Sequence, residues 1–311
     1  MSDQDRLDLV TGAFSYTGGE IARRLLESGR RVRTLTFHPD REHALQGEVE
    51  ALAYSFDDPV ALARSLDGVS VLHNTYWVRF DHGRTTFADA IENSRMLFAA
   101  ARRAGVERIV HVSITNPSIS SPLPYFRGKA LVERALAQSG VPFSIVRPTW
   151  IFGGRHEILA NNIAWILRHL PVFAIPGNGD YLVAPVHVDD LARLCVQSAS
   201  GDHDEILDAA GPQTLRFREL VEEIGTVVDA HGPVLRLPPR VMAIAAGVLG
   251  RLVGDVVLTP EEIAGLQAGL LVSHRPPLGT IRFTDWLAQN ANTLGRNYAN
   301  ELNRHYTQAV A

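Results

Sequence analysis

A glycine-rich turn near the start of the chain constrains the fold more than any other segment. Residues 11–19 (TGAFSYTGG) stand between a short apolar stretch and residues 20–27, whose apolar side chains recur at helical spacing. Gly12 and Gly18 take the first and third positions of a G-x-x-G-x-x-G pattern, and Ser15 takes the middle one. In a strand–turn–helix unit, such a loop aims the amides of the helix N-terminus at a phosphate group. The sequence therefore predicts a dinucleotide-binding turn at its first strand–helix connection.

Strand-like and helix-like segments then alternate as far as about residue 146, with short connectors between them. This order predicts a parallel, doubly wound sheet, and all-apolar strands fit a sheet that helices cover on both faces. The expected strands are 7–10, 32–37, 49–54, 69–72, 108–112 and 143–146. The expected helices are 20–27, one opening at Asp58-Pro59, 87–104 and 129–138.

The composition changes after Pro148, where Trp, Pro and Gly become frequent. We expect a helix over 158–170, one further strand over 181–188, a helix over 189–197, and a final helix that begins at Thr284. The predicted fold class is α/β: a doubly wound parallel sheet of the Rossmann type with a smaller, mostly helical C-terminal substrate lobe. The dinucleotide-binding domain would comprise 1–150, with 181–198 returning to the sheet, and the lobe 151–180 and 199–311.

Composition disfavours several classes of function. The formal net charge is −4 and no cluster of cations stands out, so we expect no nucleic-acid partner. Cys195 is the single cysteine, which argues against a disulfide framework and favours a reducing, cytoplasmic location. The 12 histidines lack the spacing of metal ligands, so no metal site is expected. The first residues lack the pattern of a signal peptide.

The most apolar stretch, residues 241–253, is too short to span a membrane. Arg240 and Arg251 enclose ten uncharged residues, whereas a spanning helix needs about 20. We expect a helix packed within the protein. The alternatives are a helix at a membrane surface or a contact in a homodimer.

Lys129 is the only lysine, although the chain has 30 lysine and arginine residues in total. Tyr125 precedes it by four residues at the start of a predicted helix, so the two side chains share one face. A phenol is too weak an acid for catalysis at neutral pH until a nearby cation lowers its pKa. An ammonium can contact ribose hydroxyls and the phenol together, which a guanidinium does poorly. The pair predicts acid–base chemistry at a carbonyl or hydroxyl carbon.

Two hydroxyl side chains, Ser113 and Thr115, follow the predicted strand 108–112. At the carboxyl end of a strand in such a sheet, ligand contact is the default expectation. One of them should hydrogen-bond the substrate oxygen and polarise it. The alternative is that both only cap the loop.

The end of the second strand bears on the choice of cofactor. It reads Phe37-His38-Pro39-Asp40-Arg41, with no acid on the strand itself to bind a ribose 2′-hydroxyl. His38 and Arg41 could hold a 2′-phosphate, so we expect NADP, with NAD as the alternative.

Together these motifs resemble the extended or atypical short-chain dehydrogenase/reductases, and most of all their NAD-dependent epimerase/dehydratase group. The resemblance rests on 11–19, the Tyr125/Lys129 pair, Arg147-Pro148-Thr149 and 185–191 (PVHVDDL), and it covers about residues 1–195. In that family the fifth strand ends in three small residues, of which the third is catalytic. The resemblance therefore implies Thr115 as the catalytic hydroxyl, with Ser113 as the second choice.

The chain also departs from the family pattern. Asn116-Pro117 stand where sugar-nucleotide dehydratases carry Asp-Glu, which disfavours their elimination chemistry. Tyr54-Ser55-Phe56 replace a Gly-Asp-Leu segment whose Asp holds adenine. Aromatic residues in the loop after the fourth strand could stack on a substrate or fill the cleft.

The expected site residues fall into three groups. The catalytic group is Tyr125, Lys129, Thr115 and Ser113. The cofactor group is Gly12, Phe14, Ser15, Tyr16, Thr17, Gly18, Phe37, His38, Arg41, Phe56, Asn74, Thr75, Tyr125, Lys129 and Pro148. The substrate group is Tyr76, Trp77, Trp150 and Asn162.

Two functions follow from these residues. The first is an NAD(P)-dependent oxidoreductase or epimerase that acts on a small-molecule carbonyl or secondary hydroxyl by hydride transfer. The second is a non-catalytic NAD(P)-binding regulator or assembly protein, like the accessory subunit of respiratory complex I or the NmrA-like regulators. The intact Tyr–Lys pair favours the enzyme.

Overall fold

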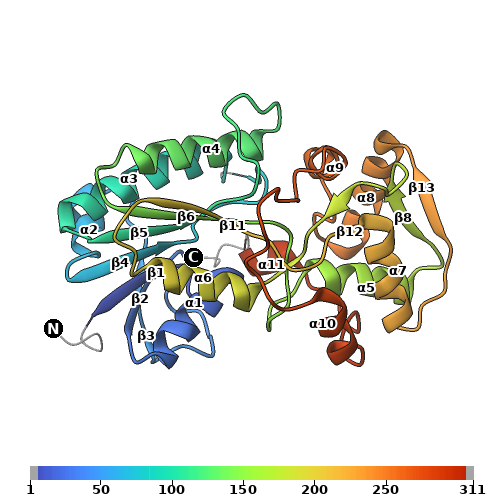
Figure 1. Cartoon of the computed structure of the whole chain (residues 1–311), viewed down its shortest axis with the longest axis horizontal. Helices are drawn as coiled ribbons and strands as arrows, with labels where there is room; N and C mark the ends of the chain where they lie inside the picture. The colour runs from blue at the N-terminus through green and yellow to red at the C-terminus, as the bar shows by residue number, and fades with distance from the viewer. Residues whose placement is uncertain (1–5, 84, 306–311) are drawn as a thin grey trace. The chain divides into compact units, whose positions relative to one another are not determined.

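The chain folds into two compact units (Figure 1). The computed structural model describes residues 6–83 and 85–305. The first unit comprises Met1–Pro148 and Val188–Ala209, and the second comprises Thr149–His187 and Ala210–Ala311. The chain thus leaves the first unit after Pro148 and returns to it for one helix and one strand.

A seven-stranded sheet forms the centre of the first unit, in the order β11-β6-β5-β4-β1-β2-β3. All neighbouring strands are parallel. The order reverses between β1 and β4, so the carboxyl ends of these strands form the crevice where such sheets bind ligands. This confirms the predicted fold class. The strands are β1 (Leu7–Thr11), β2 (Arg31–Thr36), β3 (Val49–Ala53), β4 (Val69–Asn74), β5 (Arg108–Val112), β6 (Phe143–Pro148) and β11 (Glu205–Ala209).

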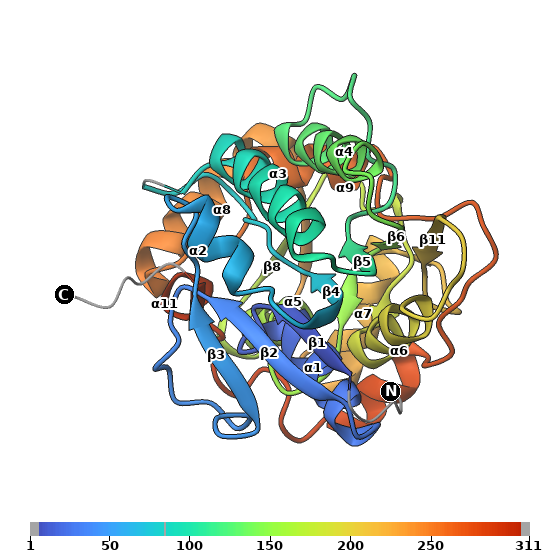
Figure 2. The same cartoon turned by 90° about the vertical axis from the view of Figure 1, so that its left-hand side faces the viewer.

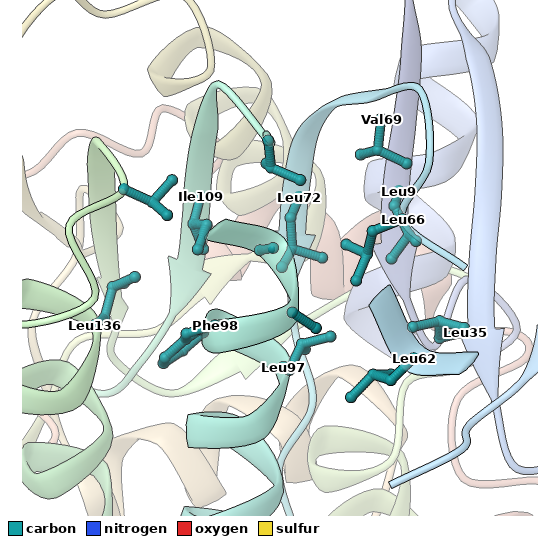
Figure 3. Close-up of a cluster of buried hydrophobic side chains, with 14 of the residues drawn as sticks. Leu9, Leu35, Leu62, Leu66, Val69, Leu72, Leu97, Phe98, Ile109 and Leu136 are labelled. Atoms are coloured by element: carbon teal, nitrogen blue, oxygen red, sulfur yellow. The ribbon is translucent and has the colours of Figure 1, made fainter. Parts of the chain in front are cut away.

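Helices cover both faces of this sheet (Figure 2). One face carries α1 (Tyr16–Glu27) and α6 (Val188–Ser198), and the other carries α2 (Pro59–Arg64), α3 (Phe87–Ala104) and α4 (Pro124–Ala137). Between the sheet and α2–α4 lies a cluster of leucines with Phe98 and Ile109 (Figure 3). The burial of these side chains fixes the positions of α3 and α4, and α4 carries the Tyr–Lys pair.

Local signals explain where α2 and α3 begin and end. The Asp58 carboxylate accepts hydrogen bonds from the amides of Val60 and Ala61, which caps α2. Thr86 caps α3 in the same way through the Asp89 amide, and Gly105 ends it with φ +75°. Both helices match their predicted positions because their signals are contained in a few consecutive residues.

The predicted strand over 181–188 is wrong. Leu182–Val183 (β9) pairs with Leu215–Arg216 (β12), and Val186–His187 (β10) pairs with Ile151–Phe152 (β7), all in the second unit. Pro185 has no amide hydrogen and divides the apolar stretch into these two short pieces. The seventh strand of the sheet is β11, which pairs with β6 alone and whose mostly half-buried residues, Glu205 and Asp208 among them, fit an edge strand.

The second unit is mostly helical around its own aromatic and aliphatic core. A two-stranded sheet also joins β8 to β13. Its further elements are α5 (Leu159–His169), β8 (Phe173–Pro176), α7 (Phe217–Val227), β13 (Val234–Leu237), α8 (Pro239–Val253), α9 (Pro260–Gln267), α10 (Phe283–Asn290) and α11 (Glu301–His305). No helix in the described part of the chain is long and apolar enough to cross a lipid bilayer.

Two helix predictions for this unit need correction. The helix predicted from Thr284 is divided in two: α10 begins after Arg282 and stops at Asn290, and α11 follows at Glu301–His305. Gly295 lies between them in a left-handed conformation (φ +71°). Residues 241–253 do form a helix, α8, but only its small residues are buried. Four larger apolar side chains, Val241, Ile244, Val248 and Leu252, are exposed, so the prediction of a helix packed within the protein holds for only one face of α8.

The turn between β1 and α1 depends on close backbone contact. Gly12 has φ +68°, and its N–H donates to the Leu35 carbonyl at 2.9 Å. A Cβ atom on Gly18 would lie 2.3 Å from the Gly12 carbonyl oxygen. Ser15 has φ −110°, so the side chain at the middle glycine position causes no strain.

We predict that Gly18→Ala destabilises the first unit, whereas Gly19→Ala does not. The added methyl group at residue 18 must push backbone apart, which costs about 2 kcal/mol or more. At residue 19 the nearest backbone oxygen would lie 3.3 Å from the new Cβ, and the helix gains up to about 1 kcal/mol from alanine. Urea denaturation of both variants measures the difference. Equal stabilities would contradict the role of the contact.

Candidate functional site

The start of α1 suits an anionic group. Tyr16 and Thr17 form its first turn, which contains no acidic residue. Ser15 makes no side-chain cap to the helix, and its hydroxyl donates to the Gly12 carbonyl at 2.6 Å instead of pointing to a ligand. Helix N-terminal amides and the helix dipole favour negative charge at this position. The turn therefore fits the pyrophosphate of a dinucleotide.

Thr11, the last residue of β1, ties this turn to the loop after β4. Its hydroxyl donates to Asn74 Oδ1 (3.1 Å) and accepts from the amides of Thr75 (2.7 Å) and Tyr76 (3.0 Å). The Thr75 hydroxyl donates to the Thr11 carbonyl at 2.5 Å, and Asn74 Nδ2 lies 3.1 Å from His111 Nδ1. Asn74 and Thr75 thus hold the loop in place, and direct contact with a cofactor stays a prediction for both.

Four aromatic rings gather at the carboxyl ends of β2, β3 and β4. Ring centroids of Phe37 and Tyr54 are 4.7 Å apart, those of Tyr54 and Phe56 are 4.8 Å apart, and those of Phe56 and Tyr76 are 5.5 Å apart. Phe37 is 60% exposed, so the cluster presents a ring face on which a planar base could stack. Burial raises the pKa of Tyr54, which stays a neutral phenol. Sequence reasoning missed Tyr54, although it lies beside Phe56.

Three further residues predicted to bind the cofactor, His38, Arg41 and Phe14, lie in or near the turns after β2 and β1. The Arg41 amide donates to the His38 carbonyl at 3.2 Å, which closes the turn after β2. Arg41 is exposed and His38 is half-buried. Phe14 is buried, with its ring 4.9 Å from the imidazole of His43. A guanidinium at the end of an acid-free strand is compatible with a 2′-phosphate.

Lys129 is buried, with 3% of its surface exposed. Its Nζ donates to the Val112 carbonyl at the carboxyl end of β5, at 3.0 Å. Burial lowers the pKa of Lys129 to about 7, although the negative charge of Glu133 acts to raise it. Arg147 engages the Glu133 carboxylate with two guanidinium nitrogens, at 2.9 and 2.5 Å. Burial therefore makes this ammonium easier to deprotonate than an exposed lysine.

The indole ring of Trp77 brings Lys129 and Tyr125 together. Lys129 Nζ lies 4.7 Å from the ring centroid, and the Tyr125 ring meets the indole edge-on with centroids 5.9 Å apart. The indole reaches α4 because residue 128 is glycine, where a Cβ would lie 2.8 Å from the Trp77 ring. Phe87 stacks on the indole, at 5.8 Å. Trp77 thus lies over Lys129 in this structure, and a contact of Trp77 or Tyr76 with a substrate stays a prediction.

The predicted catalytic hydroxyls lie at the end of β5. The amides of Ser113 and Thr115 donate to the carbonyls of Val146 (2.8 Å) and Pro148 (3.0 Å), so the β5–β6 pairing continues past the strand end. Both side chains are buried. Within the described residues Ser113 Oγ has no hydrogen-bond partner, so its hydroxyl has a donor and an acceptor to offer at the end of β5.

The predicted substrate residues Trp150 and Asn162 serve the second unit itself. Trp150 is buried in that core, with its ring 5.7 Å from Phe283. The Asn162 amide donates to the Ala299 carbonyl and accepts from the Ala299 amide, each at 2.9 Å. Their roles in substrate binding stay predictions. Elsewhere in the described chain, no group of three His, Cys, Asp or Glu residues could hold a metal.

We predict that Trp77→Ala raises the pKa of Lys129 by at least about one unit. Water would reach the ammonium and reverse a desolvation effect that can amount to 3–5 units, whereas the lost cation–π contact favours the charged form by only about 1 kcal/mol. Selective ¹³C labelling of lysine marks a single residue in this chain, so its ε-carbon resonance can be titrated directly. Trp165→Ala, in the second unit, is the control. An unchanged or lower pKa in Trp77→Ala would contradict burial by the indole.

The chain is similar to a known family and to several known proteins. Residues 12–161 match the NAD(P)H-binding family model. The chain is 28% identical to (4-alkanoyl-5-oxo-2,5-dihydrofuran-3-yl)methyl phosphate reductase of Streptomyces griseus, over 91% of this chain and 97% of the relative. It is 32% identical to sterol demethylase protein B of Methylococcus capsulatus, over 75% of this chain and 78% of that relative. It is 24% identical to the NADH-ubiquinone oxidoreductase 40 kDa subunit of Neurospora crassa, over 82% of this chain and 68% of that relative.

Solved structures share the fold. Triphenylmethane reductase of Citrobacter sp. superposes with a TM-score of 0.73 at 18% identity, covering 92% of this chain and 99% of that one. The NADPH-dependent quinone oxidoreductase of Escherichia coli, solved with NADPH, gives 0.72 at 20% identity, covering 92% and 98%. These structures show the fold. The family-model match over residues 12–161 and the 32% identity to sterol demethylase protein B, together with the glycine turn, identify the chain as a member of the extended short-chain dehydrogenase/reductase superfamily.

Proposed function

We propose that the chain is an NAD(P)H-dependent oxidoreductase that reduces a carbonyl group or oxidises the corresponding secondary alcohol, with Tyr125 as the acid–base residue. The observation that carries the proposal is the buried ammonium of Lys129, one helical turn from Tyr125 and against the same indole ring. A lysine with a pKa near 7 is rare outside functional sites.

The residues divide the chemistry as follows. A bound nicotinamide would supply or accept the hydride. Tyr125 would donate a proton to the carbonyl oxygen during reduction and accept it during oxidation. The positive charge of Lys129 favours the phenolate form, which brings the acidity of the phenol toward neutral pH. Thr115, or Ser113 as the second choice, would hydrogen-bond the same oxygen.

Epimerisation needs only one further condition. If the ketone remains bound, rotates within the site and is reduced on its other face, the same residues invert the configuration of the carbon centre. The surroundings of β2 lead us to propose NADP as the preferred cofactor, since Arg41 is exposed and no carboxylate stands on that strand.

The second candidate is a non-catalytic role in which the dinucleotide is structural or sensed. The kinship with the 40 kDa subunit of NADH-ubiquinone oxidoreductase supports it, as does the indole that covers Lys129. In that case the Tyr–Lys pair would serve cofactor binding alone.

Removing the phenol should abolish turnover while leaving cofactor binding intact. We expect Tyr125→Phe and Lys129→Met each to lower kcat for carbonyl reduction by at least about a hundredfold, measured as NADPH oxidation with a panel of ketones and quinones. Tyr181→Phe is the matched control, because its buried hydroxyl has no partner in the described structure. Turnover that survives both substitutions would favour the non-catalytic candidate.

The cofactor preference can be tested at one guanidinium. We expect Arg41→Ala to weaken NADPH binding by about tenfold and NADH binding by much less, since a charge-assisted hydrogen bond to the 2′-phosphate is lost. Arg31→Ala, at the opposite end of β2, should change neither, and calorimetric titration measures both cofactors. Equal effects of Arg41→Ala on the two would contradict the NADP preference.

A further inference from the structure

The helix α8 presents an unpartnered apolar stripe. Val241, Ile244, Val248 and Leu252 are spaced by three or four residues and therefore line one face. Ile244 is 69% exposed and Leu252 is 79% exposed. The buried side of α8 consists of Ala246 and Gly250. Met242, Leu249 and Val253 are partly buried, so the exposed apolar stripe is one face of a helix whose other face is covered.

The charged side chains of α8 and of the neighbouring strand β13 are all arginines, whereas α9, which also packs against α8, carries Glu261 and Glu262. Arg240 and Arg251 on α8 and Arg236 on the neighbouring strand β13 are exposed, and none makes an ion pair within the described chain. No Asp or Glu occurs from residue 231 to residue 254. A chain with a net charge of −4 thus carries one cationic, apolar face, which we name the α8 face.

We propose that the α8 face binds the surface of an anionic lipid bilayer, with α8 lying in the plane of the headgroups. An interfacial helix buries one apolar face by about 5–10 Å and places arginines at the lipid phosphates. With 15 residues at about 1.5 Å each, α8 is shorter than the hydrocarbon core of about 30 Å. The helix therefore lies on the membrane and does not cross it.

A second copy of the chain fits this face less well. A two-fold pairing presents the same patch on both copies, so α8 would pack against α8. Arginines at both ends of the stripe would then face arginines, and the helix and β13 offer no carboxylate to neutralise them. Phosphate groups of lipids provide the missing negative charge.

Flotation with lipid vesicles tests the proposal on the full-length chain. We expect the protein to float with phosphatidylcholine vesicles that contain phosphatidylglycerol, and to float at least about tenfold less with pure phosphatidylcholine. Added salt should weaken the binding. Equal partition into both vesicle types, or no binding to either, would overturn the proposal.

Two double variants separate the two contributions. Ile244→Glu with Leu252→Glu should reduce partition by about a hundredfold or more, because two apolar side chains leave the interface and two charges are repelled. Arg240→Gln with Arg251→Gln should reduce it by about tenfold or more and remove the preference for anionic lipid.

Controls on α2 exclude a general surface effect. Val60 and Arg64 are also exposed on a helix, so Val60→Glu and Arg64→Gln should leave flotation unchanged. Circular dichroism verifies that every variant is folded. If the α8 variants float like the parent chain, or if they instead abolish a concentration-dependent dimer seen by ultracentrifugation without lipid, the α8 face is not a membrane-binding surface.

Discussion

The burial of one ammonium group sets the conditions for the rest of the site. Lys129 loses its hydration on a helix that is held by the core beneath α3 and α4. The Val112 carbonyl, the face of the Trp77 indole and the charge of Glu133 compensate in part for the lost water. The consequence is a cation whose pKa lies near 7 and whose charge responds to whatever enters beside it. Tyr125 lies one turn away on the same helix.

A buried polar chain connects this ammonium to the phosphate-binding turn. It runs through Thr11, Asn74 and His111 at the ends of β1, β4 and β5. Burial, and next the charge of Lys129, lower the pKa of His111 well below its usual value, so this imidazole is neutral. Each member fixes its neighbour's orientation, which makes the carboxyl edge of the sheet one rigid frame.

Sequence reasoning succeeded where the signal is local and failed where packing decides. Six strands and five helices of the first unit follow from apolar periodicity, caps and glycines, and the spacing of Tyr125 and Lys129 fixes their common face. The contact of Trp77 with Lys129 could not be predicted, because it depends on how closely the loop after β4 approaches Gly128. The seventh strand, β11, was missed because residues 181–188 are more apolar and were predicted in its place, although Pro185 divides them. The exposed face of α8 could not be predicted because it depends on what the neighbouring elements leave uncovered.

The central claim is that Lys129 and the dinucleotide meet at the end of β5. The most direct measurement follows the ε-carbon resonance of selectively ¹³C-labelled Lys129 while NADPH is added, with binding followed in parallel by calorimetry. We expect this single resonance to shift and the shift to saturate at the stoichiometry of binding. We also expect its titration midpoint to change, because phosphate and ribose groups replace the indole beside the ammonium. A resonance that does not move while the cofactor saturates its site would contradict it.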